Sequence, residues 1–321
     1  MRDTADEIQS GDGTMTPSHP DARPHWRALE PGQLSRLVVF DLTSGTSTVV
    51  HESADHVFEA PNWTPDGASL IFNQDGAMYQ IAVDDTAHPQ RIDTGAIDTA
   101  NNDHVLSPGG DLLYLSAGDG HIHAVELATG TVRKVTNDHG QHFIHYLHGV
   151  SPDGALLAYI GFERRNGKPP LTNVFTIPSA GGADRQLTRS EKPHDGSEFS
   201  PDGEWIYFNS ERASTRAGHA QLFRMRRDGS EVAQLTFDER VNWFPHLSPD
   251  GRQLIYISFE SGVEGHPANK NVIIRLTTPD GGTGEDLVQL FGGQGTINVN
   301  SWAPDGTRFA YVEYPMATRA G

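Results

Sequence analysis

The sequence predicts an all-β fold, a six-bladed β-propeller with four antiparallel strands per blade, and three observations lead to this prediction. A short turn recurs six times, each turn precedes a strand and a hairpin, and the hairpin missing from the last repeat is found near the N-terminus. A repeat of 20–50 residues is typical of propellers and solenoids. The six turns begin at Thr64, Ser107, Ser151, Ser200, Ser248 and Ala303.

The turn itself has the residues of a β-turn between antiparallel strands. Five copies read Pro-Asp-Gly, four of them after Ser or Thr and one after Ala303, and the sixth reads Pro-Gly-Gly. Proline presets the backbone for the second turn position, Asp tolerates the third, and Gly accepts the conformation that follows. Short apolar runs come after each turn, for example Leu254–Ile257, and such runs are typical of buried strands.

A hairpin follows each of the first five strands. The second blade, for example, carries 121–125 and 132–135 around an Ala-Thr-Gly turn. One strand before the turn, one after it and two in the hairpin make a four-stranded propeller blade.

The sixth repeat lacks its hairpin, because a single strand, 309–312, precedes the end of the chain. Residues 37–42 and 48–50, around Thr43-Ser44-Gly45, have the pattern of the missing hairpin. We expect this N-terminal hairpin to complete the last blade, which closes the ring and removes open sheet edges. The predicted organisation is therefore an N-terminal tail or strap, 1–34, and one propeller, 35–321.

The charge balance excludes some partners. The chain has 42 acidic and 24 basic residues, a formal net charge of −18, which disfavours nucleic acid and anionic membranes. It has no cysteine, which excludes disulfides, thiolate metal sites and cysteine nucleophiles. Acidic residues at the N-terminus and no apolar segment behind them predict a cytoplasmic location, or a periplasmic or secreted one if a leader has been removed.

These turns, with aromatic residues before and apolar strands after them, resemble the repeats of the TolB-type propeller over about residues 35–321. Segments 242–246, 265–270 and 292–299 resemble a TolB-like subgroup. This likeness implies a propeller that binds a protein or another ligand without catalysis. The repeats are more distantly similar to oligogalacturonide lyase, whose propeller holds a divalent metal on histidines and a glutamine.

Histidines near the start of the innermost strands are candidate metal ligands. His104 and His148 lie four residues before their turn prolines, and His246 lies three before. Three imidazoles at one height could hold Zn, Mn or Ca with an oxygen ligand such as Gln294. The alternative is that these imidazoles bond neighbouring backbone and water.

Carboxylates recur in the loops that leave the second strands, at Glu163, Glu211 and Glu260. Such groups serve as general acids and bases, bind sugar hydroxyls, or tie down their own loops. Lys270, in a long loop of the fifth blade, could neutralise a substrate carboxylate or be simply solvated. The candidate catalytic residues are His148, Glu198, Glu211, Glu260 and Lys270.

Polar and aromatic residues of the same segments are candidate substrate ligands. They are Asn62, Asp195, Trp243, His266, Asn269, Asn298 and Asn300. Together the candidates favour a carbohydrate-active enzyme, a lyase or glycoside hydrolase, that acts on an oligosaccharide or other small polar ligand in the central funnel. The alternative is a non-catalytic TolB-like propeller that binds a protein partner or ligand on its funnel face.

Overall fold

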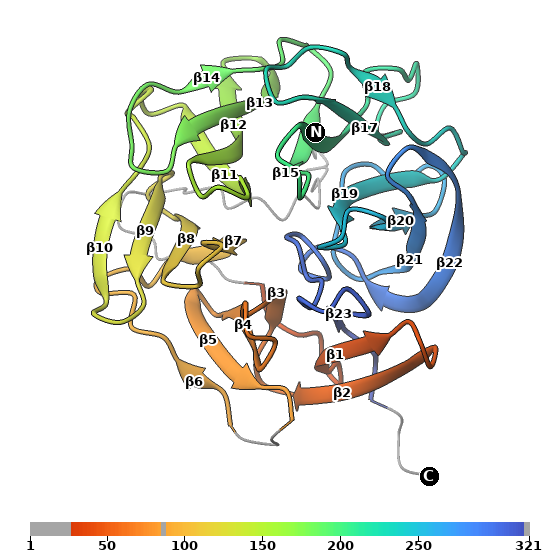
Figure 1. The fold of residues 1–321 in the computed structure, drawn as a ribbon. Helices are drawn as coiled ribbons and strands as arrows, with labels where there is room; N and C mark the ends of the chain where they lie inside the picture. Colours follow the sequence, from red (N-terminus) through yellow and green to blue (C-terminus); the bar gives the residue numbers. More distant parts are fainter. Residues whose placement is uncertain (1–26, 85–87, 318–321) are drawn as a thin grey trace, which may run out of the picture.

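A computed structural model describes residues 27–84 and 88–317, which form a ring of six sheets around a central channel (Figure 1). The described residues form no helix, and so none that could cross a membrane. The predicted all-β, six-bladed propeller is confirmed. Residues 1–26 of the predicted tail lie outside the described residues, whereas 27–34 lie against the propeller.

Five blades are four-stranded antiparallel sheets, each made from consecutive strands. The first two contain β3 (Phe58–Trp63), β4 (Ser69–Gln74), β5 (Ala77–Ala82) and β6 (Gln90–Arg91), then β7 (Ala100–Leu106), β8 (Leu112–Ala117), β9 (Ile122–Glu126) and β10 (Thr131–Lys134). The next two contain β11 (Phe143–Val150), β12 (Leu156–Arg165), β13 (Lys168–Pro178) and β14 (Arg185–Gln186), then β15 (His194–Phe199), β16 (Trp205–Ser210), β17 (Gln221–Arg226) and β18 (Ala233–Gln234). The fifth contains β19 (Val241–Leu247), β20 (Leu254–Phe259), β21 (Lys270–Thr278) and β22 (Gly281–Gly292).

The last blade joins the two ends of the chain. Strand β1 (Ser35–Asp41) pairs with β2 (Thr46–Ser53) on one side and with β23 (Arg308–Glu313) on the other. An isolated bridge between Trp302 and Phe309 takes the place of the innermost strand. The expected closure by the N-terminal hairpin is therefore present.

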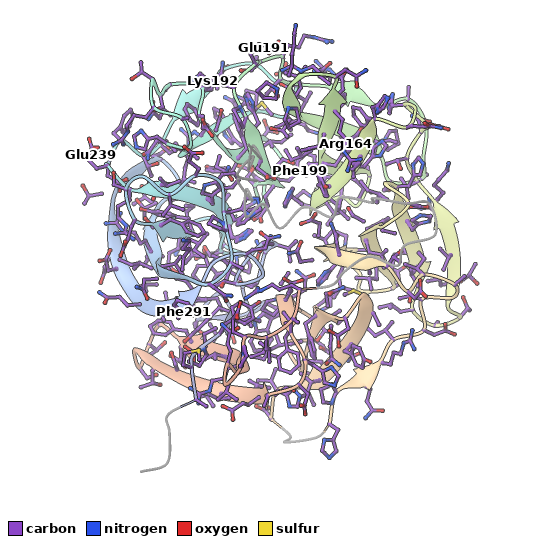
Figure 2. The ribbon with its side chains drawn as sticks, turned by 180° about the vertical axis from the view of Figure 1, so that it is seen from behind. Arg164, Glu191, Lys192, Phe199, Glu239 and Phe291 are labelled. Carbon is purple, nitrogen blue, oxygen red and sulfur yellow. The ribbon has the colours of Figure 1, made fainter. Side chains whose placement is uncertain are left out.

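The hydrophobic core lies between neighbouring blades, where sheet faces pack against each other. One cluster joins Phe309 and Tyr311 of the last blade to Ile255 and Ile257 of the fifth. Another joins Leu37 of the closing strand to Phe58 of the first blade. Figure 2 shows the ring from behind, with side chains filling the spaces between blades. Inner strands such as β4 and β20 are thus buried on both faces, whereas outer strands such as β2 and β10 are largely exposed.

The six turns contact one another in a ring, which we call the Pro-Gly collar. In each turn the Gly amide donates to the carbonyl of the first residue, as Gly251 does to Ser248 (2.8 Å). Each Gly has a positive φ, which suits glycine, and its Cα faces the proline of the preceding turn. The contacts are Gly110 on Pro65, Gly154 on Pro108, Gly203 on Pro152, Gly251 on Pro201, Gly306 on Pro249 and Gly67 on Pro304.

The closing strand can be tested by Val39→Pro. Val39 lies in β1, which has a partner strand on both sides, so proline removes a ladder hydrogen bond that alanine keeps. We expect Val39→Ala to lower the free energy of unfolding by about 2 kcal/mol and Val39→Pro to lower it much further in urea titrations. Equal losses in the two variants would show that closure does not depend on this pairing.

Candidate functional site

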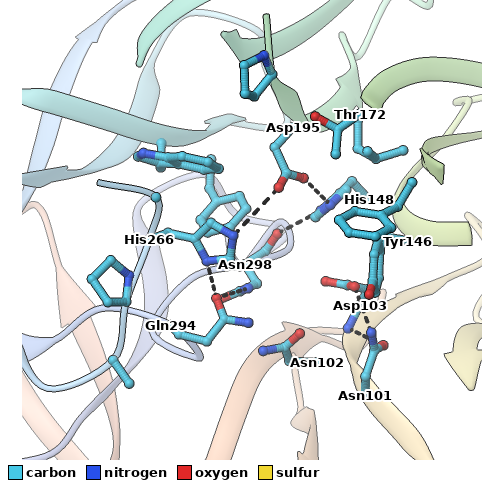
Figure 3. Close-up of a pocket in the computed structure, with 18 of the residues that line it drawn as sticks. Asn101, Asn102, Asp103, Tyr146, His148, Thr172, Asp195, His266, Gln294 and Asn298 are labelled. Atoms are coloured by element: carbon cyan, nitrogen blue, oxygen red, sulfur yellow. Dashed lines mark hydrogen bonds and ion pairs between the residues drawn. The ribbon is translucent and has the colours of Figure 1, made fainter. Parts of the chain in front are cut away.

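One end of the central channel opens into a cavity of about 610 Å³ (Figure 3). Its polar walls come from the innermost strands of the first five blades, which contribute Glu59, Asp103, His148, Asp195 and Trp243. These strands run from the cavity toward the Pro-Gly collar, so the collar lies at the opposite end of the channel. A volume of this size suits a small ligand.

Bulges in the innermost strands aim side chains at the cavity. The pairing register breaks between Asp195 and Glu198 in β15 and between Trp243 and His246 in β19. Inside the second break Phe244 has φ 53°, and its amide is held by Asn209 Oδ1 (3.1 Å). A bulge of this kind re-aims the side chains on either side of it. Asp195 and Trp243 therefore line the cavity, while Glu198 and His246 lie deeper in the channel.

Asp195 is the centre of the polar side of the cavity. Its Oδ1 lies 2.8 Å from His148 Nε2 and its Oδ2 lies 3.6 Å from His266 Nε2 (Figure 3). The Gly196 amide donates to Oδ1 (2.8 Å). Burial works against ionisation, but the contact with His148 and the nearby imidazole of His266 hold the pKa of Asp195 well below its usual range. Asp195 is therefore a carboxylate at neutral pH.

His148 lies between two carboxyl groups. Burial disfavours its charge, but Asp103 and Asp195 outweigh this and raise the pKa of His148 to about 9. Its Nδ1 faces the carbonyl of Asn298 (3.2 Å), so both ring nitrogens face acceptors. Burial raises the pKa of Asp103 to about 6, against the opposing effect of His148. At neutral pH the cavity thus holds an imidazolium between an ionised Asp195 and an Asp103 near its own pKa.

Amide side chains continue the polar wall. His266 Nδ1 contacts Gln294 Oε1, which also accepts from Asn298 Nδ2 (3.1 Å), and the Gly295 amide donates to Asn298 Oδ1 (2.8 Å). These bonds hold the segment that follows β22 in one conformation. Hydroxyl groups of a ligand would find both donors and acceptors here.

Arg27, just before the closing strand, reaches over this wall. Its guanidinium donates to the Gln294 carbonyl (2.8 Å) and to Asn269 Oδ1 (3.1 Å). It also pairs with Glu59 (3.6 Å) and stacks on the Tyr314 ring, 3.8 Å from the centroid. Arg27 therefore joins the N-terminal segment to the first, fifth and last blades at the mouth of the cavity.

Aromatic rings lie beside the polar residues of this side of the cavity. The rings of Trp243 and His266 have centroids 4.5 Å apart, and Phe244 lies 5.1 Å from His266. Trp243 Nε1 is buried and has no hydrogen-bond partner among the described residues. A buried N–H without an acceptor is costly, and a bound ligand could supply one.

The structure brings about half of the predicted site residues to the cavity. Those that line it are His148, Asp195, Glu211, Trp243, His266, Asn269, Gln294 and Asn298. Glu163, Glu260 and Lys270 are exposed and lie outside its lining. Glu211 is buried, and burial raises its pKa.

Four other candidates form buried contacts deeper in the channel. Glu198 accepts from His246 Nδ1 (2.6 Å), from the Leu247 amide (3.2 Å) and from Asn300 Nδ2 (2.6 Å). Asn62 Nδ2 donates to the Asn300 carbonyl (2.7 Å). This network ties the first, fourth, fifth and last blades together, which is a structural task.

The three histidines do not form the predicted metal site. Of the three, His148 alone lines the cavity. His246 uses both ring nitrogens, for Glu198 and for the Ile297 carbonyl (2.6 Å). His104 is fully buried in the first two blades, and burial lowers its pKa to about 4. No group of three or more His, Asp or Glu among residues 27–84 and 88–317 could hold a metal ion.

Three charged residues that line the cavity escaped the sequence prediction, namely Asp103, Glu59 and Arg27. Asp103 precedes His104, and adjacent strand residues point to opposite sides. A fixed count back from the turn proline that selects His104 therefore passes over Asp103. Glu59 lies in the same strand as Asn62, which was the residue predicted from this segment, but a bulge separates the two. Arg27 belongs to the predicted tail, and no local pattern marks its contacts.

The fold and cavity define a class, namely a six-bladed β-propeller with a ligand-sized polar pocket at one end of its channel. Residues 149–281 match the PD40 family, described as the TolB beta propeller domain. The chain is 37% identical to "Uncharacterized protein Atu1656" of Agrobacterium fabrum, over 87% of this chain and 92% of that one. The chain belongs to the TolB-like β-propeller family.

Two solved structures and a more distant sequence relative are also similar to this chain. The "putative TolB" of Agrobacterium tumefaciens superposes with a TM-score of 0.80 at 36% identity, covering 88% of this chain and 99% of that one. Tol-Pal system protein TolB of Francisella tularensis is 22% identical over 85% of this chain, which spans 60% of that protein's length. An oligogalacturonate lyase in complex with manganese has a TM-score of 0.54 at 15% identity, over 80% of this chain and 67% of the lyase, which shows the fold alone.

A manganese site like the one named for that lyase does not fit the residues present here. The ring nitrogens of His148 and His266 already face oxygen atoms of Asp195, Asn298 and Gln294. A metal would have to displace these contacts. The groups in the cavity that can transfer protons are its own carboxyl groups and imidazoles.

Glu198→Gln tests the structural task of the channel network. The change removes the negative charge that His246 Nδ1, Leu247 and Asn300 contact, so we expect the free energy of unfolding to fall by about 3 kcal/mol. Glu260→Gln, at an exposed position, should change it by less than about 0.5 kcal/mol. Equal urea midpoints for both variants would contradict this role.

The charge on His148 can be followed by NMR titration of its imidazole. Removing the Asp195 carboxylate by Asp195→Asn should lower the pKa of His148 from about 9. Because this pKa is raised above that of the unfolded chain, about 6.5, the pairing stabilises the fold fully below pH 6.5. That stabilisation should be lost as the pH rises through 9. An unchanged titration in the variant would exclude the pairing.

Proposed function

We propose that the protein is a carbohydrate-active enzyme of the glycoside hydrolase type, which acts on a neutral oligosaccharide or similar glycoside in the cavity. One observation carries the proposal: two carboxyl groups flank His148, and their pKa values are pushed apart, with Asp103 near 6 and Asp195 far lower. Such a separation assigns one group as the acid and leaves the other ionised.

Asp103 has the properties of the general acid. With a pKa of about 6 it keeps a useful fraction of its proton near neutral pH and can donate it to the glycosidic oxygen as the C–O bond breaks. Asp195, ionised, can stabilise the positive charge that develops on the sugar ring. Water then adds to the anomeric carbon, and the proton it releases restores the acid.

The charge of His148 favours hydrolysis over elimination. A lyase needs a base beside the carbon that loses its proton, and an imidazolium with a pKa of about 9 has no free lone pair at neutral pH. A uronate would also need an available cation, but His148 is already paired with Asp195 and Arg27 with Glu59. A neutral sugar, bound through amides and the Trp243 face, suits this cavity better.

The alternative is a TolB-like propeller that binds a protein or ligand without catalysis, as its relatives named for the Tol-Pal system suggest. These relatives also favour the periplasmic location over the cytoplasmic one predicted from the N-terminus, and cell fractionation would test this. A cavity that binds sugars without turnover would support the alternative.

Asp103→Asn distinguishes the two functions. Wild-type protein is screened against neutral oligosaccharides by thermal shift, and the ligands that bind are tested for release of reducing ends. We expect Asp103→Asn to lower kcat by about 10²–10⁴-fold with little change in binding, because the amide cannot donate the proton. Lys270→Ala, outside the cavity, is the control and should keep full activity.

Three other results would each reject a different part of the proposal. Undiminished turnover by Asp103→Asn would rule out this residue as the acid. Binding without turnover by the wild type would leave the non-catalytic alternative, and no binding by any sugar would reject a carbohydrate ligand.

A further inference from the structure

One wall of the cavity differs from the rest, because the long hairpin β12–β13 of the third blade supplies it. Strand β12 has 10 residues, whereas the second strands of the other four-stranded blades, β4, β8, β16 and β20, have 6 each. Strand β13 has 11, whereas its counterparts β5, β9, β17 and β21 have 6, 5, 6 and 9. The extension pairs Glu163 with Leu171 and Arg165 with Lys168. In Figure 2, Arg164 marks this part of the hairpin. The extra length carries the hairpin beyond the blade, at the mouth of the cavity.

Most of the side chains that this region turns toward the cavity are apolar; the exceptions are Thr172 and the hydroxyl of Tyr146. Ile160 and Phe162 alternate with Gly161 and so lie on the same side of β12. Tyr146 of β11 pairs directly with Ile160, and its ring meets Phe162 edge-on, with centroids 6.0 Å apart. We call Tyr146, Ile160, Phe162, Pro169 and Pro170 the apolar wall; all five line the cavity.

The apolar wall lacks the charges of the opposite side. Of the described residues, β12 and β13 contribute Ile160, Phe162, Pro169, Pro170 and Thr172 to the lining, and none carries a charge. Phe162 and Tyr146 are only partly buried, and both prolines are exposed. The free energy falls when a matching apolar group covers apolar surface that was in contact with water. Apart from the Tyr146 hydroxyl, the wall thus offers its side-chain surface to apolar groups of a ligand.

The two sides are close enough for one ligand. Thr172 of the hairpin and Asp195 lie in the same close view, together with His148 and Tyr146 (Figure 3). The Thr172 hydroxyl accepts from the His194 amide (3.1 Å), which fixes the hairpin beside the residue that precedes Asp195. A ligand in a cavity of about 610 Å³ can therefore touch both the acid groups and the apolar wall.

We infer that the ligand is amphipathic: a glycoside whose sugar lies against Asp103, His148 and Asp195 and whose alkyl or aryl aglycone lies against the apolar wall. The inference rests on the proposed function for its sugar part. It adds the class of aglycone, because a sugar ring held on the polar side, against Trp243, leaves Phe162 and the two prolines to contact a second, apolar group.

Matched ligands test the inference. Methyl and octyl glycosides of the same sugars (β-glucose, β-galactose and α-mannose) are titrated calorimetrically below the concentration at which the octyl compounds form micelles. 1-O-Octylglycerol serves as an amphiphile without a sugar ring. The octyl glycoside of the preferred sugar should bind at least about tenfold more tightly than its methyl counterpart, as expected for several methylenes in an apolar site.

Variants assign the preference to the wall. Phe162→Ser should remove most of the octyl preference and leave the methyl glycoside within about twofold of wild type. Pro170→Ser, at an exposed position, repeats the test with little risk to folding. Lys168→Ser, on the same hairpin but outside the cavity lining, is the control and should keep the full preference.

The outcomes separate the inference from the proposed function. Equal affinity for methyl and octyl glycosides overturns the inference and keeps a carbohydrate ligand. Tight binding of octylglycerol, lost in Phe162→Ser, with no binding of any glycoside, supports the apolar wall and rejects the sugar. Failure of all the compounds to bind overturns both. An octyl preference that Phe162→Ser and Pro170→Ser both retain overturns the inference, because the apolar wall is then not its cause.

Discussion

The antiparallel pairing of β1 with β23 is the contact on which the rest of the molecule depends. Six residue pairs, from Arg36–Glu313 to Asp41–Arg308, convert a row of sheets into a closed ring. The ring in turn sets the spacing of the innermost strands around the channel. Because the closing strand comes from the N-terminal side, the same pairing places Arg27 over the cavity, against Gln294 and Asn269. Closure and the shape of the binding site therefore have one origin.

Much of the fold could be predicted because its signals are local and repeated. Turns such as Ser248-Pro249-Asp250-Gly251 are encoded by four adjacent residues whose backbone preferences act alone. Closure could be predicted as well, since a propeller with a missing hairpin leaves a sheet edge that needs a partner. The contacts of the Pro-Gly collar could not, because each joins Gly and Pro residues of different repeats.

The site was predictable only in part, and the bulges are the main reason. Counting from the turn prolines gives the height of a residue along the channel, and this placed His148 correctly. It does not give the direction of a side chain after a bulge. Glu198 and His246 therefore contact each other deeper in the channel and do not line the cavity. Asp103 and His104 show the limit most clearly, because one residue step exchanges the cavity for the core. Three-dimensional contacts, such as those of Arg27, leave no pattern in the sequence.

The direction of the closing strand has a practical consequence for handling the molecule. Ser35 begins β1 and Glu313 ends β23 at the same end of the last blade, where Gln33 bridges to Met316. A tag or surface anchor inserted next to Gln33 or Met316 would therefore join the propeller on the face that holds the cavity. The Pro-Gly collar, on the opposite face, is the better place for immobilisation, for a fluorescent label or for a fused reporter.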